Sequence, residues 1–280
     1  MDDSKNPELG KTMQAAGIAT NYIEAGEGPP VVLIHGSGPG VTAYANWRLT
    51  LPGLSTHLRV LAPDMAGFGY TERKPGVRYD LDFWIGHLLG CLDAWGLERT
   101  HLVGNSFGGG LALAFAHRYP ERVDKLVLMG SVGVSFELTY GLDAVWGYQP
   151  SMEEMRKLIG IFAHNKQLIS DELVASRYKA SVRPGYQESF SSLFPEPRQA
   201  HIEALATPEQ DIAALPHEVL IVHGRDDQVI PVSNAIRLNG LLQRSDLHIF
   251  GQCGHWTQIE RATQFNRLVK DFLIGGSKSD

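Results

Sequence analysis

The sequence has few cysteines, no block of basic residues and no long apolar run. Cys91 and Cys253 are the only cysteines among 280 residues, and their separation excludes a CxxC motif, a zinc-type cluster and a disulfide framework. The 25 basic residues are scattered and the formal net charge is −6, which argues against nucleic acid or an anionic membrane as a partner. No apolar stretch approaches the roughly 20 residues that span a bilayer, and residues 1–10 are too acidic and polar for a signal peptide. We therefore expect a cytoplasmic protein with no metal site, no nucleic-acid partner and no membrane partner.

Short β-branched runs alternate with helix-like segments from residue 30 onward. This alternation is typical of parallel strands joined by crossover helices, and it predicts an α/β fold. Two earlier runs, 11–16 and 20–24, predict an antiparallel pair, which brings the expected mixed sheet to eight strands. The other expected strands are 31–34, 60–62, 101–103, 125–129, 219–222 and 247–250, and the expected helices are 43–54, 81–95, 107–119, 233–242 and 261–272.

Strand signals disappear between about residues 134 and 205. Two helix-like segments, 151–165 and 170–182, lie there, and Ser170 is placed to cap the second. This stretch holds nine of the 25 Phe, Trp and Tyr residues, which favours a helical lid with an apolar underside, although the aromatic rings could equally dock the helices onto the core. The predicted boundaries are 134–205 for the lid and 1–133 and 206–280 for the two parts of the core domain.

The segment Gly104-Asn105-Ser106-Phe107-Gly108 follows a predicted strand and leads into a predicted helix. A nucleophile elbow needs this context, because the chain reverses sharply at the serine and only small residues fit two positions before and after it. The serine hydroxyl then projects at a helix N-terminus, where developing negative charge is favoured. We predict that Ser106 is a nucleophile; the alternative is a glycine-rich turn in a Rossmann-like binding fold.

A serine nucleophile needs a base and an acid that orients the base. His255 follows the last predicted strand and Asp227 follows the one before it, so the chain order is Ser, Asp, His. All three residues fall at the carboxyl ends of predicted strands, where open α/β sheets place their sites. Asp226 is the rival acid, because sequence spacing does not decide between neighbours.

The glycine-rich loop 35–40 follows the predicted strand 31–34. Its position fits the loop that supplies the second oxyanion-hole donor, so the backbone N–H groups of Ser37 and Phe107 are expected to converge on an oxyanion formed at Ser106. A phosphate-binding loop is the competing interpretation, but neither GxxxxGK[ST] nor GxGxxG is present. We interpret His35 as a buried residue that hydrogen-bonds the loop backbone.

Six segments together resemble the meta-cleavage product hydrolases, which are carbon–carbon bond hydrolases of the α/β-hydrolase superfamily. They are HGSGPG (35–40), AYANWR (43–48), GNSFGGG (104–110), LVLMGSVG (126–133), GRDDQVIP (224–231) and CGHWTQIE (253–260). The resemblance runs along nearly the whole chain, including segment 177–199, and within the family it is strongest to the 2-hydroxymuconic semialdehyde hydrolases. It implies the α/β-hydrolase fold: a mostly parallel eight-stranded sheet flanked by helices, with an inserted helical lid.

The resemblance also assigns roles to individual residues. Ser106, Asp227 and His255 match the family's catalytic triad, which favours Asp227 over Asp226, and Ser37 and Phe107 match its oxyanion-hole amides. The implied substrate-binding residues are Arg177, toward the substrate carboxylate and dienol oxygen, Trp256, and Asn46 and Asn105 at the dienoate end. The resemblance implies neither a metal nor an organic cofactor, and it implies a homo-oligomer.

The expected reaction is hydrolysis of 2-hydroxymuconate semialdehyde and close 6-alkyl analogues to 2-hydroxypenta-2,4-dienoate plus formate or acetate, in aromatic-compound catabolism. A carboxylesterase with the same triad is the alternative enzyme, because fold alone does not choose the substrate. A non-catalytic small-molecule receptor is the alternative of another class. The preferred C6 substituent, the oligomeric state and the choice between an acyl-enzyme and a gem-diol route stay open at this level.

Overall fold

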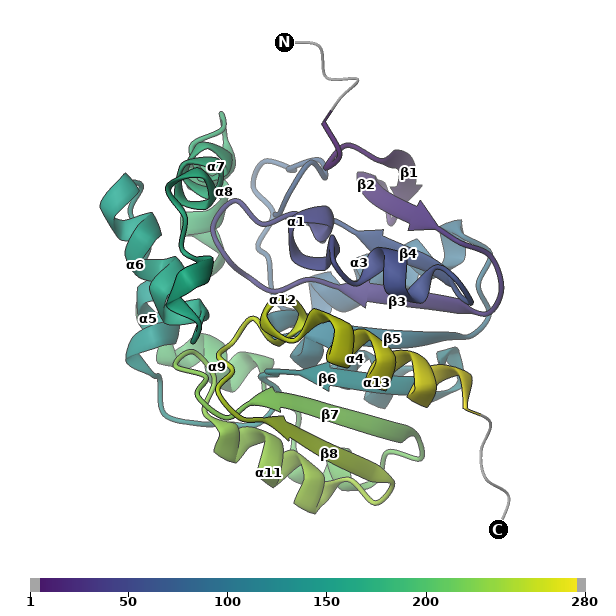
Figure 1. Ribbon diagram of the computed structural model, residues 1–280. Helices are drawn as coiled ribbons and strands as arrows, with labels where there is room; N and C mark the ends of the chain where they lie inside the picture. Colours follow the sequence, from purple (N-terminus) through teal and green to yellow (C-terminus); the bar gives the residue numbers. More distant parts are fainter. Residues whose placement is uncertain (1–5, 276–280) are drawn as a thin grey trace.

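A computed structural model describes residues 6–275 and contains a mixed sheet of eight strands in the order β1-β2-β4-β3-β5-β6-β7-β8 (Figure 1). The strands are β1 (Lys11–Ala15), β2 (Ile18–Ala25), β3 (Pro30–Ile34), β4 (Arg59–Pro63), β5 (Thr100–Asn105), β6 (Val123–Met129), β7 (Glu218–Gly224) and β8 (Ser245–Phe250). β1 pairs antiparallel with β2 and β2 antiparallel with β4, and every other pairing is parallel. The predicted α/β class and the mostly parallel eight-stranded sheet are therefore confirmed.

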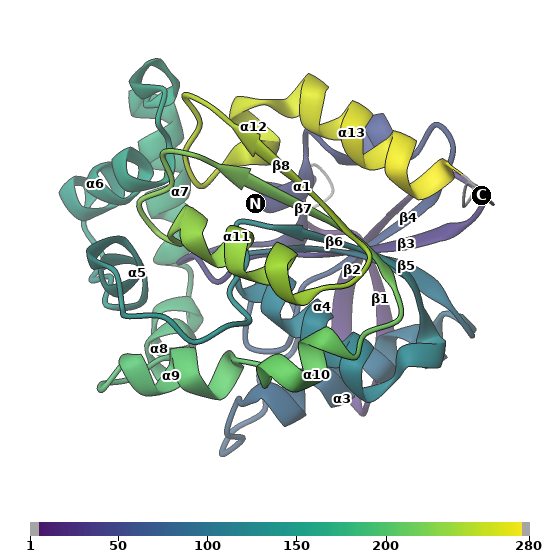
Figure 2. The same cartoon turned by 90° about the horizontal axis from the view of Figure 1, so that it is seen from below.

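Alternate side chains of the central strands face opposite layers of helices. On β3, Val31 and Leu33 belong to one hydrophobic cluster, whereas Val32 and Ile34 belong to another. This period-two alternation buries both faces of the sheet, as parallel sheets require. Figure 2 shows the two layers, with α13 on one side of the sheet and α3, α4 and α11 on the other. The core helices are α1 (Ala43–Trp47), α2 (Leu51–Leu54), α3 (Leu81–Ala94), α4 (Phe107–Arg118), α10 (Glu209–Ala213), α11 (Val232–Leu241), α12 (Thr257–Glu260) and α13 (Ala262–Ile274).

The predicted single helix 43–54 is wrong in one respect, because the structure has two short helices there. α1 ends at Trp47, and α2 begins at Leu51 with Pro52 in its first turn. Proline has no N–H to donate to the carbonyl of Arg48, and its ring would clash with that carbonyl in a continuous helix. A turn over residues 48–50 separates the two helices, and Arg48 is the C-cap residue of α1.

Five α-helices and one short 3-10 helix (Lys166–Leu168) fill the segment 134–205, and the next strand after β6 is β7. The α-helices are α5 (Tyr140–Trp146), α6 (Met152–Phe162), α7 (Asp171–Ser181), α8 (Tyr186–Leu193) and α9 (Gln199–Leu205). Both views place these helices together beside the carboxyl ends of the parallel strands (Figures 1 and 2). The Ser170 side chain accepts a hydrogen bond from Leu173 N at 3.1 Å, which confirms it as the N-cap of α7.

The aromatic residues of this helical segment do not share one role. Trp146 and Phe194 stack at 4.3 Å between ring centroids, and Phe194 also packs against Trp84 and Phe107 of the core. Tyr140, by contrast, is 68% exposed. Docking therefore explains part of the set, and Phe162 lines the pocket. Among the described residues, no helix has the length and apolar character needed to cross a membrane.

Candidate active site

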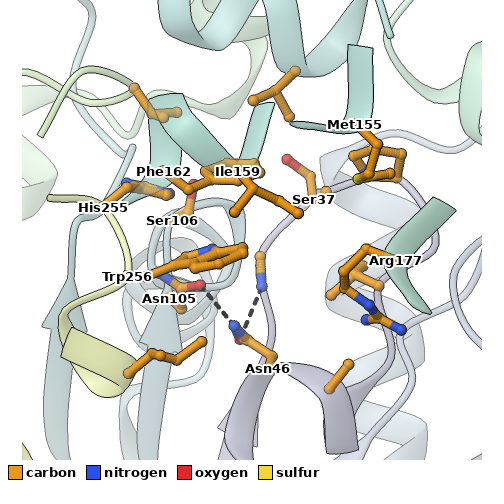
Figure 3. Close-up of a pocket in the computed structure, with 18 of the residues that line it drawn as sticks. Ser37, Asn46, Asn105, Ser106, Met155, Ile159, Phe162, Arg177, His255 and Trp256 are labelled. Carbon is orange, nitrogen blue, oxygen red and sulfur yellow. Dashed lines mark hydrogen bonds between the residues drawn. The ribbon is translucent and has the colours of Figure 1, made fainter. Parts of the chain in front are cut away.

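A pocket lies between the carboxyl ends of the central strands and helices α5, α6 and α7 (Figure 3). Its empty volume is about 780 Å³, including space open to solvent. The apolar lining includes Leu142, Val145, Met155, Ile159, Phe162 and Val229, and the polar lining includes Ser37, Asn46, Arg48, Asn105, Ser106, Arg177 and His255. An apolar wall with a few convergent polar groups is typical of a small-molecule site.

Ser106 occupies a strained turn between β5 and α4. Its backbone angles are φ 55° and ψ −115°, a conformation that residues with a Cβ rarely adopt. The turn closes only because glycines flank it: a Cβ at Gly104 would lie 2.3 Å from Gly108 O, and one at Gly108 would lie 2.3 Å from Ile34 O. The steric role predicted for both glycines is therefore confirmed, and the serine is presented at the N-terminus of α4.

Asp227 and His255 form a buried pair at the ends of β7 and β8. Asp227 Oδ2 lies 2.7 Å from His255 Nδ1, and Asp227 Oδ1 accepts hydrogen bonds from the backbone amides of Val229 at 2.7 Å and Ile230 at 3.0 Å. His223 Nε2 also approaches Asp227 Oδ2, at 3.3 Å. Burial by itself raises the pKa of Asp227, but the charge of His255 and the hydrogen bonds from both histidines outweigh it and hold the pKa well below its ordinary value.

The neighbouring carboxylate of Asp226 points elsewhere. It accepts a hydrogen bond from Cys253 N at 3.3 Å and contacts Arg225 at 3.4 Å, on the surface of the β7–α11 loop. The choice that sequence spacing left open is therefore decided by geometry, because Asp227 and not Asp226 faces the imidazole of His255.

The helical segment contacts the histidine loop directly through Phe162 at the end of α6. The carbonyl of Phe162 accepts a hydrogen bond from His255 N at 2.8 Å, and the phenyl ring stacks on the imidazole at 5.9 Å and on Trp256 at 5.1 Å. Within residues 6–275, the Ser106 hydroxyl makes no hydrogen bond, and both Ser106 and His255 line the pocket. The hydroxyl is thus open to a ligand beside the imidazole (Figure 3).

Side-chain hydrogen bonds hold the loop after β3, which lies beside the serine. Ser37 Oγ accepts a hydrogen bond from Trp146 Nε1 of α5 at 3.0 Å. His35 lies beneath the loop: its Nδ1 bonds Gly36 O at 2.7 Å, and its Nε2 accepts from Met65 N at 2.9 Å. Burial lowers the pKa of His35 to about 4, so the ring is neutral and the structural interpretation of this histidine is confirmed.

Phe107 brings only its backbone toward the site. It is the first residue of α4, so its N–H has no acceptor within the helix and remains available to an anion. Its side chain is buried among core aromatics and packs edge-on against Trp84 at 4.7 Å.

Asn46 and Asn105, which the family resemblance implies as substrate-binding residues, both line the pocket and contact each other. Asn46 Nδ2 donates to Asn105 Oδ1 at 3.1 Å, while Gly36 N donates to Asn46 Oδ1 at 3.3 Å (Figure 3). Asn105 Nδ2 in turn donates to Met129 O at 3.4 Å. These bonds fix both amides as polar parts of the wall.

Arg177 also lines the pocket, and its guanidinium is paired with a residue that sequence reasoning missed. Arg177 Nη2 donates to Glu8 Oε1 at 3.1 Å, and Arg183 Nη1 lies 2.8 Å from Glu8 Oε2. Burial lowers the pKa of Arg177, and the charge of Glu8 opposes that shift. No pattern in residues 6–9 marks Glu8, because its partner lies 169 positions away along the chain. His223 and Arg48 were missed for the same reason, since each depends on contacts across the fold.

The sequence predicts no metal site anywhere in the chain, whereas the structure describes residues 6–275. Among residues 6–275, no three His, Cys, Asp or Glu side chains are grouped closely enough to hold a metal ion.

The sequence and the structure of this chain are similar to those of known proteins. The family model described as "alpha/beta hydrolase fold" matches residues 29–262. A 2-hydroxy-6-oxo-2,4-heptadienoate hydrolase of Pseudomonas putida is 60% identical over 96% of this chain and 97% of its own length. A 2-hydroxymuconate semialdehyde hydrolase of Pseudomonas sp. strain CF600 is 58% identical over 96% of this chain and 95% of its own length. The solved structure of a serine-to-alanine mutant of a meta-cleavage product hydrolase from Pseudomonas fluorescens IP01, complexed with acetates, superposes with a TM-score of 0.95 at 59% identity, and the match covers 96% of this chain and 98% of that one.

Proposed function

Because the chain belongs to the α/β-hydrolase fold family and, within it, to the meta-cleavage product hydrolases, we propose that it hydrolyses 2-hydroxymuconate semialdehyde and close 6-alkyl analogues. The products are 2-hydroxypenta-2,4-dienoate and formate, or acetate from the 6-methyl analogue. As a member of this family the chain is a hydrolase of carbon–carbon bonds, and its role lies in aromatic-compound catabolism. A cytoplasmic location and a homo-oligomeric state stay predictions.

The observation that carries the proposal is the layout of the pocket. The Ser106 hydroxyl and the imidazole of His255 line the same cavity as the guanidinium of Arg177, with Asn46 and Asn105 in its wall. A substrate with a carboxylate at one end and a carbonyl at the other fits such a cavity. Arg177 binds the C1 carboxylate through charge-assisted hydrogen bonds, and the carbonyl carbon C6 then lies at the serine.

Cleavage of a carbon–carbon bond needs an acceptor for the electrons of the departing carbon. The 2-hydroxy-6-oxo-dienoate supplies one after tautomerisation, in which the 2-hydroxyl loses a proton and C5 gains one. The resulting 2,6-diketone has its C3–C4 double bond conjugated with the C2 carbonyl. We assign the proton transfer to His255, which Asp227 orients through the 2.7 Å contact at Nδ1.

The serine then attacks C6. His255 takes the hydroxyl proton of Ser106, and the oxyanion that forms at C6 accepts hydrogen bonds from the N–H groups of Ser37 and Phe107. The C5–C6 bond breaks, its electron pair passes through C3–C4 to the C2 oxygen, and the product leaves as the dienol after protonation. Water hydrolyses the acyl-enzyme and regenerates the serine. Residues 134–205 act as a lid in this scheme, since α5 and α6 supply the apolar cover of the pocket.

The test is the loss of dienolate absorbance with the purified protein and with two variants. Ser106→Ala is expected to abolish turnover of the dienoate and of a small neutral ester. Arg177→Met is expected to reduce dienoate turnover by orders of magnitude while sparing the ester, because the ester has no carboxylate to anchor. Wild-type protein that cleaves the ester but not the dienoate would make the chain a carboxylesterase and overturn the proposal. Tight dienoate binding without turnover of either substrate would instead indicate a receptor.

A further inference from the structure

Three arginines and a glutamate gather at one end of the pocket. Glu8 bonds Arg177 at 3.1 Å and lies 2.8 Å from Arg183, and the charges of Glu8 and Arg48 both act on Arg177. They come from three separate parts of the chain: the segment before β1, the turn after α1, and the α7 region of the helical segment. Positive charge therefore exceeds negative charge in this cluster, which we call the arginine cluster (Arg48, Arg177, Arg183 and Glu8).

The pairing within the arginine cluster is uneven. Arg177 and Arg183 share Glu8, and Arg183 also lies over the rings of Tyr70 at 4.9 Å and Tyr186 at 5.5 Å. No carboxylate among the described residues pairs with Arg48. Its Nη1 donates to the carbonyl of Ala45 at 2.7 Å, and the structure records no acceptor for its other N–H groups within residues 6–275.

A second carboxylate near the cluster does not fill this role. Asn21 Nδ2 donates to Glu8 O at 3.0 Å and to Asp64 Oδ2 at 2.8 Å, so Asp64 lies behind Asn21. Asp64 does not line the pocket, and its oxygens already accept from the backbone amides of Ala43 and Tyr70. Asp64 therefore does not pair with Arg48.

Arg48 is half-buried and lines the pocket beside Asn46 and Arg177. Removing a guanidinium from water is costly unless a partner takes up its hydrogen bonds, and burial accordingly lowers the pKa of Arg48. An unpaired, partly desolvated cation in a cavity wall favours an anionic ligand. Arg48 is the C-cap residue of α1, in the turn between α1 and α2.

We propose that Arg48 is a second guanidinium ligand of the substrate carboxylate, beside Arg177. Glu8 binds one nitrogen of the Arg177 guanidinium, Nη2. The substrate carboxylate lies between Arg48 and Arg177 and supplies negative charge to a cluster in which positive charge is in excess. Two cationic ligands bind a carboxylate more strongly and in a more defined orientation than one, which directs C6 toward Ser106. This inference rests on the proposed function for the identity of the substrate, but a carboxylate ligand of any similar shape tests it.

The experiment measures binding without chemistry. Sorbate (hexa-2,4-dienoate) and its neutral analogue hexa-2,4-dien-1-ol are titrated calorimetrically into Ser106→Ala, alone and combined with Arg48→Met. Loss of one charge-assisted contact is expected to weaken the binding of sorbate about 10- to 100-fold and to leave the affinity for the alcohol unchanged. Arg48→Lys, which keeps the charge but loses the planar fork, is expected to restore part of the affinity.

Arg73→Met is the matched control, because it removes one positive charge close to the cluster, where Arg73 lies over the ring of Tyr186 at 4.3 Å, at a residue that neither lines the pocket nor pairs with Glu8. This variant is expected to weaken the binding of sorbate by less than about threefold, since a screened charge that does not contact the ligand contributes little to affinity. Equal weakening of sorbate binding by Arg48→Met and Arg73→Met, or equal weakening of sorbate and alcohol binding by Arg48→Met, would overturn the proposal. Melting curves of each variant exclude misfolding as the cause, and Arg48→Lys supplies the readout if Arg48→Met does not fold.

The failure of this inference is distinguishable from failure of the proposed function. If wild-type protein does not cleave 2-hydroxymuconate semialdehyde, while Arg48→Met still loses sorbate selectively, then the carboxylate site stands and the proposed reaction falls. If turnover is normal and sorbate binding is insensitive to Arg48, the reaction stands and the second ligand falls.

Discussion

Replacing Asp227 with asparagine tests the buried acid with almost no change in side-chain volume. In the native chain, Oδ1 accepts from the backbone amides of Val229 and Ile230 at 2.7 and 3.0 Å, and Oδ2 faces His255 Nδ1 at 2.7 Å. An asparagine must keep its single oxygen toward the two amides, because its NH₂ group accepts nothing. The NH₂ group of Asp227→Asn therefore occupies the place of Oδ2 and points at the imidazole.

This orientation inverts the tautomer of His255. Its Nδ1 must then accept a hydrogen bond from the amide, so the ring proton moves to Nε2, and Nε2 is no longer able to take the proton of Ser106. The second histidine does not relieve the conflict, because His223 Nε2 is held as a donor by Ile230 O at 3.0 Å. A wrong tautomer in a serine triad costs about 10⁴ in kcat, which corresponds to about 5 kcal/mol of transition-state stabilisation.

The assay follows dienolate absorbance under saturating substrate and compares Asp227→Asn with Asp226→Asn. The second variant is the matched control, since Asp226 is a neighbour with the same chemistry that contacts Cys253 N and Arg225 instead of the imidazole. Its kcat is expected to stay within about twofold of wild type, because exposed pairs contribute little. Circular dichroism and melting curves establish that both variants are folded. A kcat for Asp227→Asn within tenfold of wild type, or an equal loss in both variants, would refute the tautomer argument.

Two further predictions concern the elbow and acid stability. Gly104→Ala is expected to prevent the native turn, because the new Cβ would lie 2.3 Å from Gly108 O. The control is Gly86→Ala on the exposed face of α3, where a Cβ meets nothing within 4 Å. In urea titrations this control should raise the free energy of unfolding by about 0.5–1 kcal/mol. Burial lowers the pKa of His87 to about 4 from its ordinary value of 6.5, so the unfolded chain binds a proton first and stability falls as pH decreases from 6.5 to 4. His87→Asn, which keeps an acceptor for the backbone amide of Ala66, should flatten the dependence of unfolding free energy on pH by about one proton; an unchanged slope would contradict the assignment.

Local patterns were sufficient for the parts of the site that a few consecutive residues build. The elbow around Ser106 depends on a strand, a glycine on either side and a helix within about a dozen positions, and each of these has a signature in the sequence. The loop after β3 and the burial of His35 against its backbone follow in the same way from the glycine-rich run behind a buried strand. Helix ends were less predictable, as the break at Pro52 shows, because a proline in a first turn and one in a helix interior look alike along the chain.

The amino-acid sequence by itself determined the α/β class, the eight strands, the strained serine turn and the chain order of serine, aspartate and histidine, because backbone sterics and hydrophobic periodicity act over short distances. Only the tertiary structure decided that Asp227 and not Asp226 faces His255, that Phe162 O holds the histidine loop, and that Glu8 pairs with Arg177. These contacts join residues brought together by crossover helices and by the packing of the helical segment on the sheet. Their partners are set by the registers and orientations of whole elements, which no window of neighbouring residues contains.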